Sequence, residues 1–416
     1  MIGKLKARIE AGAHGISDEE LKSLIASEIR NEASLRDTMT LRQLGELAKD
    51  LYSDMRGFGI LDPLISDPGI TEIMINGPDK IFIERDGRIT DTGKSFESEK
   101  KLEDIIQRIV GKAGREVNRA RPIVDTRLPD GSRVNVVLPP VALGGAVMTV
   151  RRFPSEPMTM KKLIELGSLT EEAANALELL VKARYNIFIS GGTGSGKTTF
   201  LGALSGFIDG DERIITVEDS AELMLCGIKN LVSLETRNAN STGQGEVTIG
   251  DLIRTSLRMR PERIIVGEVR GGEALDMLQA MNTGHDGSVS TGHANSPSDM
   301  LRRLETMVLQ RNAGPGSDAI RAQIASAVDI VVHLSRMRDK SRKTVEISEV
   351  LEYDPHRGEI ELNPLFVFEE DPDSTKNELK GRLKRSKNRL KGTQKLVLAG
   401  FDPEILNGEV QKSCSE

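Results

Sequence analysis

The chain has 416 residues and a formal net charge of −6. This length exceeds that of one ordinary domain, so we expect two domains with appendages. The acidic balance argues against proteins that bind nucleic acid through bulk charge, and it leaves room for local basic patches.

Cysteine content and hydropathy bear on the cellular compartment. The sequence holds two cysteines, Cys226 and Cys414, in no C-x-x-C pair, which excludes a disulfide framework and a four-cysteine zinc site. The N-terminus is charged and has no apolar core, so we expect no signal peptide. The longest apolar-looking run, 134–150, is broken by prolines and glycines and should not span a membrane. We therefore expect a cytoplasmic protein with at most peripheral membrane association.

Residues 1–56 are predicted to form a small helical appendage. Apolar residues recur there at helical spacing, as Leu21, Leu24 and Ile25 and then as Leu41, Leu44 and Leu47. We interpret this appendage as a packing or interaction arm without chemistry of its own.

Residues 57–150 are predicted to form a compact α+β (PAS-like) domain. Strands are expected at 70–76, 81–84 and 88–90, with Asp86-Gly87 as a hairpin turn. A helix follows, with Leu102, Ile105, Ile106 and Ile109 on one face. A strand is expected at 124–127. After the turn Pro129-Asp130-Gly131, two more strands are expected, the second ending near residue 150. Residues 151–168 contain Pro154 and Pro157 and are interpreted as an interdomain linker that could hinge.

Residues 169–370 alternate helix and strand, which is typical of an α/β domain with a parallel sheet. The stretch from Gly191 to Thr198 fits G-x-x-x-x-G-K-[ST] between a predicted strand, 185–190, and a predicted helix, 199–208. In such a loop the glycines let backbone N–H groups face phosphate oxygens. Lys197 would place a cation between the β- and γ-phosphates, and Thr198 would hold Mg²⁺ through its hydroxyl. The sequence therefore predicts a site for ATP and Mg²⁺.

Carboxylates and histidines follow other strands of the same domain. Glu218 and Asp219 end the strand 213–217, and Glu268 ends a Walker B-like strand in which Gly267 replaces the usual aspartate. Because ligands bind at the carboxyl ends of parallel strands, these side chains should meet beside the phosphate loop. One carboxylate should orient the attacking water and another should hold Mg²⁺.

His285 and His293 lie eight residues apart in a glycine-rich segment. A metal site is possible in principle, yet no third soft ligand is near in the sequence. We prefer a γ-phosphate contact for His293, with His285 nearby.

Arginines are candidates for neutralising charge on the γ-phosphate in the transition state. Arg127 and Arg133 flank the turn of the first domain, and Arg151-Arg152 open the linker. An ordinary surface role for these arginines is about equally plausible. Four further arginines are weaker candidates: Arg254, Arg258, Arg260 and Arg270.

Residues 371–416 are predicted to form a charged tail. Between Lys376 and Lys395, nine Lys or Arg residues accompany one acid, Glu378. Leu379, Leu383 and Leu390 could share the face of a basic amphipathic helix. We favour a solvated, partly disordered tail because Gly381 and Gly392 weaken the helix.

Four ordered boxes resemble the secretion ATPase superfamily of type II secretion, type IV secretion and type IV pili. They are G-G-T-G-S-G-K-T-T, I-T-V-E-D-S-A-E-L, R-I-I-V-G-E-V-R-G-G-E-A and T-G-H-D-G-S-V-S-T-G-H-A-N-S. The first-domain strings I-T-E-I-M-I-N-G-P-D-K-I-F-I-E-R-D-G and L-P-D-G-S-R-V-N are similar to the CpaF-type ATPases of Tad/Flp pilus assembly. The absence of a four-cysteine zinc module favours this branch over the type II and classical pilus extension enzymes.

The resemblance implies a hexameric ring of RecA-like motor domains, each preceded by a nucleotide-clamping N-terminal domain. It implies Glu218 as the base, Glu268 as a magnesium residue with Thr198, and His293 as the γ-phosphate contact. Arg127 and Arg133 match arginines that reach the nucleotide. The implied nucleotide contacts from the loop are Gly192, Thr193, Gly194, Ser195, Gly196, Lys197, Thr198 and Thr199.

The implied function is an ATP-driven motor at the inner face of the cytoplasmic membrane. Its expected partners are an inner-membrane platform protein and, through it, pilin or secreted cargo. Two alternatives are a conjugation-type type IV secretion ATPase and a nucleotide-gated scaffold with negligible turnover. We expect no stable nucleic-acid partner, because the chain is acidic and has few aromatic residues on which bases could stack.

Overall fold

The computed structural model describes residues 2–13, 15–85, 87–152, 157–225, 227–237, 244–311, 316–376 and 378–407. The chain divides into two compact units, Met1–Ser155 and Glu156–Glu416. Among the described residues, no helix is both long enough and apolar enough to cross a membrane.

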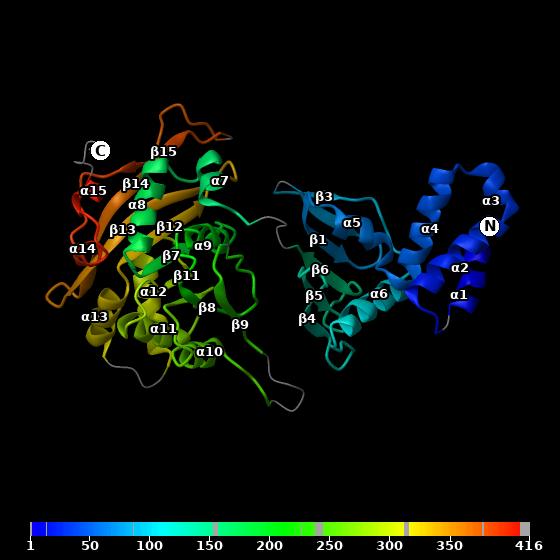
Figure 1. Cartoon of the computed structure of the whole chain (residues 1–416), viewed down its shortest axis with the longest axis horizontal. Helices are drawn as coiled ribbons and strands as arrows, with labels where there is room; N and C mark the ends of the chain where they lie inside the picture. The colour runs from blue at the N-terminus through cyan, green and yellow to red at the C-terminus, as the bar shows by residue number, and fades with distance from the viewer. Residues whose placement is uncertain are drawn as a thin grey trace. The chain divides into compact units, whose positions relative to one another are not determined.

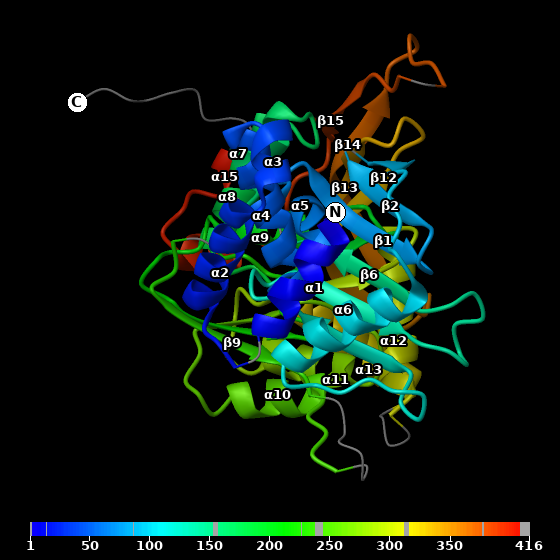
Figure 2. The ribbon, with the colours of Figure 1, turned by 90° about the vertical axis from the view of Figure 1, so that its right-hand side faces the viewer.

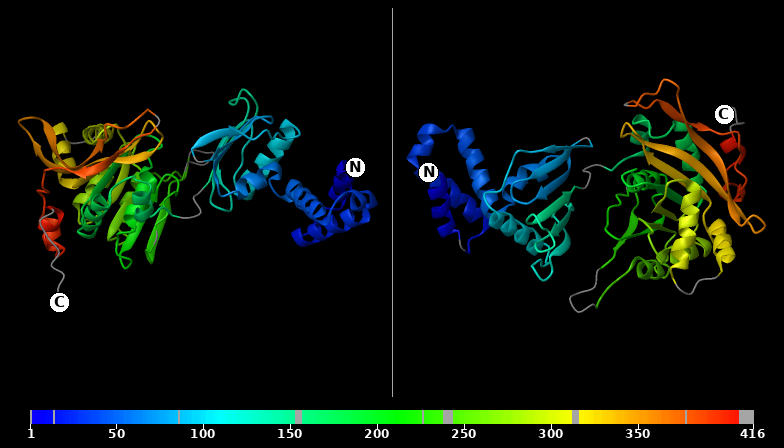
Figure 3. Two further views of the ribbon diagram at one scale, coloured as in Figure 1. Left: turned by 90° about the horizontal axis from the view of Figure 1, so that it is seen from above. Right: turned by 180° about the vertical axis from the view of Figure 1, so that it is seen from behind.

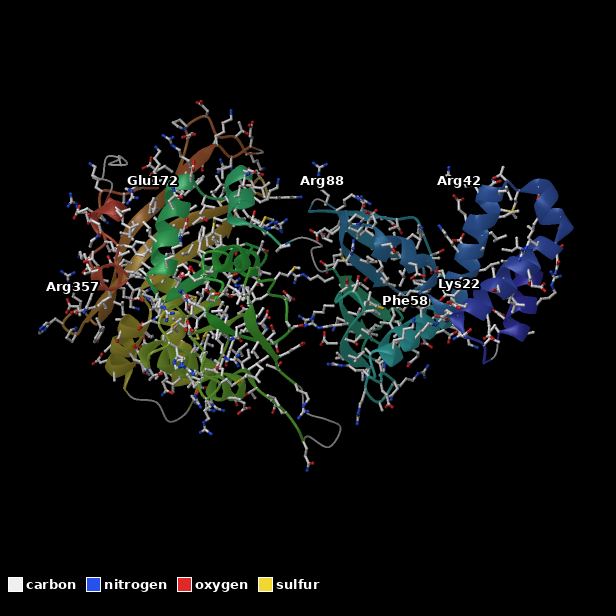
Figure 4. The ribbon with its side chains drawn as sticks, viewed as in Figure 1. Lys22, Arg42, Phe58, Arg88, Glu172 and Arg357 are labelled. Carbon is white, nitrogen blue, oxygen red and sulfur yellow. The ribbon has the colours of Figure 1, made fainter. Side chains whose placement is uncertain are left out.

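The first unit begins with four helices that pack on one another (Figure 2). They are α1 (Ile2–Gly12), α2 (Asp18–Asn31), α3 (Ala33–Thr38) and α4 (Leu41–Arg56). Ser17 and Thr40 start α2 and α4 as capping boxes, in which side chain and backbone exchange hydrogen bonds and satisfy free N–H groups. The predicted helical appendage is confirmed, but Leu41 is 89% exposed and does not join its core. Ion pairs and ring contacts tie the helices further, such as the Lys22 ammonium 5.1 Å from the Tyr52 ring centroid (Figure 4).

The remainder of the first unit is a six-stranded antiparallel sheet with the order β3-β2-β1-β6-β5-β4. The alternation of apolar residues places one face of this sheet against α6, which buries Leu102, Ile105, Ile106 and Ile109 as predicted. The predicted strands are confirmed, while Asp86 of the predicted hairpin turn lies outside the described residues. The elements are η1 (Gly59–Leu61), α5 (Asp62–Ser66), β1 (Ile70–Asn76), β2 (Ile81–Arg85), β3 (Arg88–Asp91), α6 (Glu99–Lys112), β4 (Ile123–Arg127), β5 (Arg133–Val137) and β6 (Val147–Arg151).

The second unit is built on a nine-stranded sheet with the order β15-β14-β13-β12-β7-β11-β10-β8-β9 (Figure 1). Six neighbouring strands, from β12 to β9, run parallel, and β13 to β15 continue the sheet antiparallel. The predicted α/β fold is confirmed. The strands are β7 (Ile187–Gly191), β8 (Arg213–Glu218), β9 (Asn230–Glu235), β10 (Arg263–Val266), β11 (Val289–His293), β12 (Ile330–Arg336), β13 (Arg342–Asp354), β14 (Glu359–Glu370) and β15 (Gly381–Arg385).

Helices cover both faces of this sheet, as crossovers between parallel strands require. One face carries α7, α8, α9 and α14, and the other carries α10 to α13 (Figures 1 and 3). The central strands are buried on both faces, which explains their continuous apolar runs. The helices are α7 (Met160–Glu165), α8 (Glu171–Lys182), α9 (Lys197–Ser205), α10 (Ile249–Ser256), α11 (Glu273–Asn282), α12 (Pro297–Leu309), α13 (Ser317–Ala327), α14 (Gln394–Leu398) and α15 (Glu404–Asn407).

The predicted solvated tail is wrong for the described residues after 371. Residues 381–385 form the edge strand β15, which pairs with β14, and Leu383, Leu390 and Leu396 enter the core beneath α8. Arg385 pairs at 2.5 Å with Glu172 of α8, which is labelled in Figure 4. The prediction of an amphipathic helix is also wrong for this stretch, because the buried leucines lie on a strand, in irregular backbone and in the short helix α14.

The predicted linker 151–168 also differs from the structure. Helix α7 lies within it, begins at the Thr159 cap and packs Met160 and Leu163 into the core of the second unit. Pro154 lies outside the described residues, and Pro157 precedes the helix, where proline is tolerated. The packed part of the second unit therefore begins before residue 169.

Candidate active site

The phosphate loop connects β7 to α9 as the sequence predicts. Gly191 allows a close approach, because a Cβ there would lie 2.4 Å from the Leu334 carbonyl oxygen and 2.6 Å from Ser195 Oγ. Gly196 is the N-cap of α9 with φ of 94°, a conformation that favours glycine, and it supplies no side-chain cap. The first N–H groups of α9 are thus left to an anion, with the positive end of the helix dipole behind them.

Lys197 lies at the centre of this loop and is buried. Its Nζ donates to the carbonyl oxygens of Gly191 and Gly192, each at 3.1 Å, and lies 3.2 Å from His293 Nδ1. Burial lowers the pKa of the Lys197 ammonium, and the nearby Glu268 carboxylate opposes that shift. A cation held in this way is placed for the oxygens of a bound polyphosphate.

Glu268 lies between His293 and Arg270 in a row of polar side chains that starts at Lys197. His293 Nε2 is 2.8 Å from Glu268 Oε1, and Arg270 donates to Glu268 Oε2 at 2.7 and 3.0 Å. Arg270 also lies 3.7 Å from Asp219. Burial lowers the pKa of His293, so the imidazole is neutral near pH 7.

The contact between His293 and Glu268 has an ion-pair distance but lacks hydrogen-bond alignment. Among the described residues, Glu268 Oε1 is buried and has no hydrogen-bond partner. A buried carboxylate oxygen without an aligned donor suits a hydrated cation, and Mg²⁺ prefers such oxygen ligands. This oxygen and the uncapped start of α9 together fit a nucleotide with its magnesium ion.

Glu218, the last residue of β8, is buried and fixed by the backbone. Its Oε1 accepts hydrogen bonds from the N–H groups of Glu222 at 2.8 Å and Leu223 at 2.9 Å. Gly267 follows β10 beside it, and a Cβ at Gly267 would lie 2.9 Å from Glu218 Cγ. Glycine therefore stands at the Walker B aspartate position because the Glu218 side chain occupies the adjacent space.

Comparison with known protein families assigns the chain to one of them. The model of the type II/IV secretion system protein family matches residues 54–384. The chain belongs to this family. It is therefore a secretion ATPase and an ATP hydrolase, as its motif boxes predict.

Named relatives agree with this assignment, and a solved structure agrees with the fold. The chain is 36% identical over 294 residues to the conjugal transfer protein TrbB of Rhizobium radiobacter, covering 70% of this chain and 86% of the relative. It is 33% identical over 326 residues to the type IV secretion system protein VirB11 of Brucella suis, covering 69% and 89%. The structure of the ATPase DotB of Yersinia pseudotuberculosis has a TM-score of 0.51 at 18% identity, covering 74% and 80%, which supports the fold alone.

The four predicted strand ends of this secretion ATPase meet at one edge of the sheet. Because β7, β11, β10 and β8 are neighbours and parallel, their carboxyl ends bring Lys197, His293, Glu268 and Glu218 together. Thr198 and Thr199 lie in the first turn of α9, beside the loop residues that were predicted to contact nucleotide.

His285 is not near this group, so that prediction is wrong. It precedes β11, whereas His293 ends it, which puts the two histidines at opposite ends of one strand. The carbonyl oxygen of His285 accepts a hydrogen bond from Ser288 Oγ at 2.7 Å, at the start of the strand.

Arg127 and Arg133 lie on β4 and β5 of the first unit, where they are direct register partners. Arg133 pairs with Asp125 at 3.5 Å. Their contact with nucleotide stays a prediction from the sequence. Arg254, one of the weaker candidates, instead pairs with the buried Asp276 at 3.0 Å.

Sequence reasoning missed a buried pair beneath the loop. Ser190 Oγ of β7 lies 2.8 Å from His333 Nδ1 of β12, and burial lowers the pKa of His333. The available signal was a histidine inside the apolar run Ile330-Val331-Val332-His333-Leu334, where a polar side chain needs a partner.

Proposed function

We propose that this ATPase is the motor of a conjugation-type type IV secretion system. The proposal depends on the similarity to two named relatives over most of the chain. They are the conjugal transfer protein TrbB, at 36% identity, and the type IV secretion system protein VirB11, at 33% identity. These names support substrate transfer better than the Tad/Flp pilus assembly predicted from the first-domain motifs.

The loop holds the triphosphate in this proposal. Backbone N–H groups from Gly192 to Thr199 surround the phosphates, and Lys197 neutralises the β- and γ-phosphate charge. The Thr198 hydroxyl and Glu268 would hold Mg²⁺, which when bound supplies further neutralisation of phosphate charge. The uncapped start of α9 supports this assignment.

Glu218 is the proposed base. Two backbone N–H groups fix its carboxylate at the end of β8, so it can hold a water in one orientation without moving. It accepts a proton as the water oxygen bonds to the γ-phosphorus and the bond from that phosphorus to the bridging oxygen of ADP breaks. His293 is neutral and partly exposed, and it is proposed to contact the γ-phosphate.

A homo-hexamer completes the proposal. Arg127 and Arg133 are proposed to reach a nucleotide and to make hydrolysis depend on closure. The proposed partners are an inner-membrane platform protein and, through it, the secreted cargo. The proposed location is the inner face of the cytoplasmic membrane.

ATP turnover tests the motor against the scaffold alternative. We expect Glu218→Gln to lower turnover at least 100-fold while ATP still binds. Glu235→Gln is the matched control, because Glu235 is the register partner of Glu218 on β9. Wild-type turnover no higher than that of Glu218→Gln, with membrane partners present, would support the scaffold.

Cargo transfer tests the secretion class. In the host, a Glu218→Gln chain should abolish conjugal DNA transfer or protein export and leave surface pili unchanged. Loss of pili with normal transfer would favour the pilus-assembly function instead.

A further inference from the structure

The strand order of the sheet indicates which way a bound nucleotide extends from the phosphate loop. Glu218, Glu268 and His293 end strands on one side of the loop strand β7, whereas β12 and β13 lie on its other side (Figure 1). If the γ-phosphate faces the carboxylates, as the proposed function requires, the nucleoside must extend the opposite way. That path runs over the β12–β13 hairpin.

Two arginines of this hairpin lie at the outer rim of the phosphate loop. Arg336 and Arg342 are register partners at the open end of β12 and β13. Arg342 Nε donates to the Gly194 carbonyl oxygen at 3.0 Å, and its Cδ lies 3.3 Å from the Cβ position of Gly196. Arg336 Nη1 lies 3.7 Å from the Cβ position of Gly194.

The third arginine of the hairpin is bound elsewhere. Arg338 Nε donates to the Thr375 carbonyl oxygen at 3.1 Å, and its Nη1 donates to Glu370 Oε2 at 2.9 Å. The hairpin therefore carries two exposed arginines directed at the loop and one held by β14 and the residues after it. Arg336 and Arg342 therefore face the ligand site, whereas Arg338 forms an ordinary surface ion pair with Glu370.

The guanidinium group has the right chemistry for a nucleoside. It is planar, it stacks on aromatic faces, and it carries donors for ribose oxygens. The hydrogen bond from Arg342 Nε to the Gly194 carbonyl oxygen fixes the plane of the group. Among the residues that the structure describes, no hydrogen bond occupies its terminal nitrogens, which can therefore face a ligand. The first turn of α9 already provides N–H donors for phosphates, so the hairpin is placed for the part of the nucleotide that leaves the loop.

We propose that Arg336 and Arg342 bind the nucleoside half of ATP, with a guanidinium stacked on the base. This inference rests on the proposed function, because it takes the direction of the nucleotide from the catalytic carboxylates. It assigns nucleotide recognition to the same unit that holds the phosphates.

Binding of ATP and of inorganic tripolyphosphate to the full chain tests the proposal by calorimetry. The Arg336→Ala/Arg342→Ala variant should bind ATP about tenfold more weakly, the effect of losing one base stack, and should bind tripolyphosphate as the wild type does. Arg338→Ala is the matched control and should bind both ligands normally. The Arg336→Lys/Arg342→Lys variant should bind ATP as weakly as the double alanine variant, because an ammonium does not stack as a guanidinium does.

Three results would overturn the inference. An equal loss of both ligands would assign the arginines to shaping the loop or to the phosphates. Unchanged ATP affinity in the double variant, with an unchanged melting temperature, would show that neither arginine contacts the nucleotide. A wild-type chain that binds neither ligand would instead overturn the proposed function, and the inference with it.

Discussion

The two ends of the parallel strands carry similar side chains and use them differently. At the amino end, Asn186 donates from its backbone to Asp329 at 2.6 Å and from its side chain to the Ala327 carbonyl oxygen at 2.8 Å. Lys395 joins Asp329 at 2.6 Å and Asp286 at 2.8 Å. Each charge there has fixed partners, which is how a fold stabilises polar groups that it buries.

At the carboxyl end, one buried carboxylate contact is less well aligned. Lys197 contacts loop carbonyl oxygens and His293. Glu268 lies near His293, and within the part of the chain that the structure describes its buried Oε1 lacks an aligned donor. Polar groups that are partly satisfied remain available to a ligand. The same residue types therefore stabilise the fold at one end and are proposed to bind nucleotide at the other.

Replacing one lysine at each end should give opposite results. Lys197→Ala should lower ATP turnover at least 100-fold with little change in melting temperature, because its partners are loop carbonyl oxygens. Lys395→Ala should lower the free energy of unfolding by about 2 kcal/mol, because it leaves Asp329 without its cation, and should keep turnover in the folded fraction. Calorimetric melting and a phosphate-release assay measure both. A collapse of turnover in Lys395→Ala at full stability would break the comparison.

The buried pair of Arg263 and Glu212 extends the amino-end network. Arg263 is 1% exposed and donates to Glu212 at 2.7 and 2.8 Å. Arg263→Met should lower the free energy of unfolding by about 3 kcal/mol, because the buried Glu212 carboxylate loses both hydrogen bonds from Arg263 and keeps the partly exposed Arg184 at 3.1 Å. Adding Glu212→Gln should restore part of the loss. Denaturant unfolding measures these values, and a neutral Arg263→Met would contradict the structural role.

A single methyl group at Gly267 should disturb catalysis without unfolding the chain. In Gly267→Ala the new Cβ would lie 2.9 Å from Glu218 Cγ and displace that carboxylate. We expect turnover to fall about tenfold with ATP affinity unchanged. Gly111→Ala in α6, where a Cβ meets open space, is the control. Normal turnover in Gly267→Ala would argue against Glu218 as the base.

Acid should destabilise the second unit modestly through His333. Burial lowers the pKa of His333 below its ordinary value of 6.5, so the unfolded chain takes up a proton that the folded chain refuses. The contribution of neutral His333 to folding stability is therefore fully present above pH 6.5 and is lost as the pH falls below 6.5. We expect the melting temperature to drop by a few degrees between pH 7.5 and 5.5, and by less in His333→Asn. An identical drop in both proteins would exclude His333.

Much of the site could be predicted because it depends on local sequence. The loop, its strand and its helix are continuous, and Glu218 and Glu268 each end an apolar run, so a parallel sheet brings them together. His285 and His293 are close in sequence, but β11 lies between them and separates them in space. A strand advances about 3.3 Å per residue, so residues on either side of one lie far apart.

The folded C-terminal stretch could not be predicted for a different reason. Leu379 and Leu383 are four residues apart, which is helical spacing, yet the second lies on β15 and pairs across to Phe368 of β14. Such pairing depends on a distant segment and leaves little periodicity in a five-residue edge strand. The short helix α7 could not be predicted either. Pro154 and Pro157 disfavour a helix nearby, and the burial of Met160 and Leu163 that stabilises α7 depends on packing against distant segments.

The most direct test is a structure of the chain with Mg²⁺ and a non-hydrolysable ATP analogue. The account predicts that Lys197 Nζ contacts the β- and γ-phosphates, that Glu218, Glu268 and His293 surround the γ-phosphate, and that the base lies over the β12–β13 hairpin. A nucleotide bound away from the carboxyl ends of β7, β8, β10 and β11, or a γ-phosphate directed at the hairpin, would contradict it.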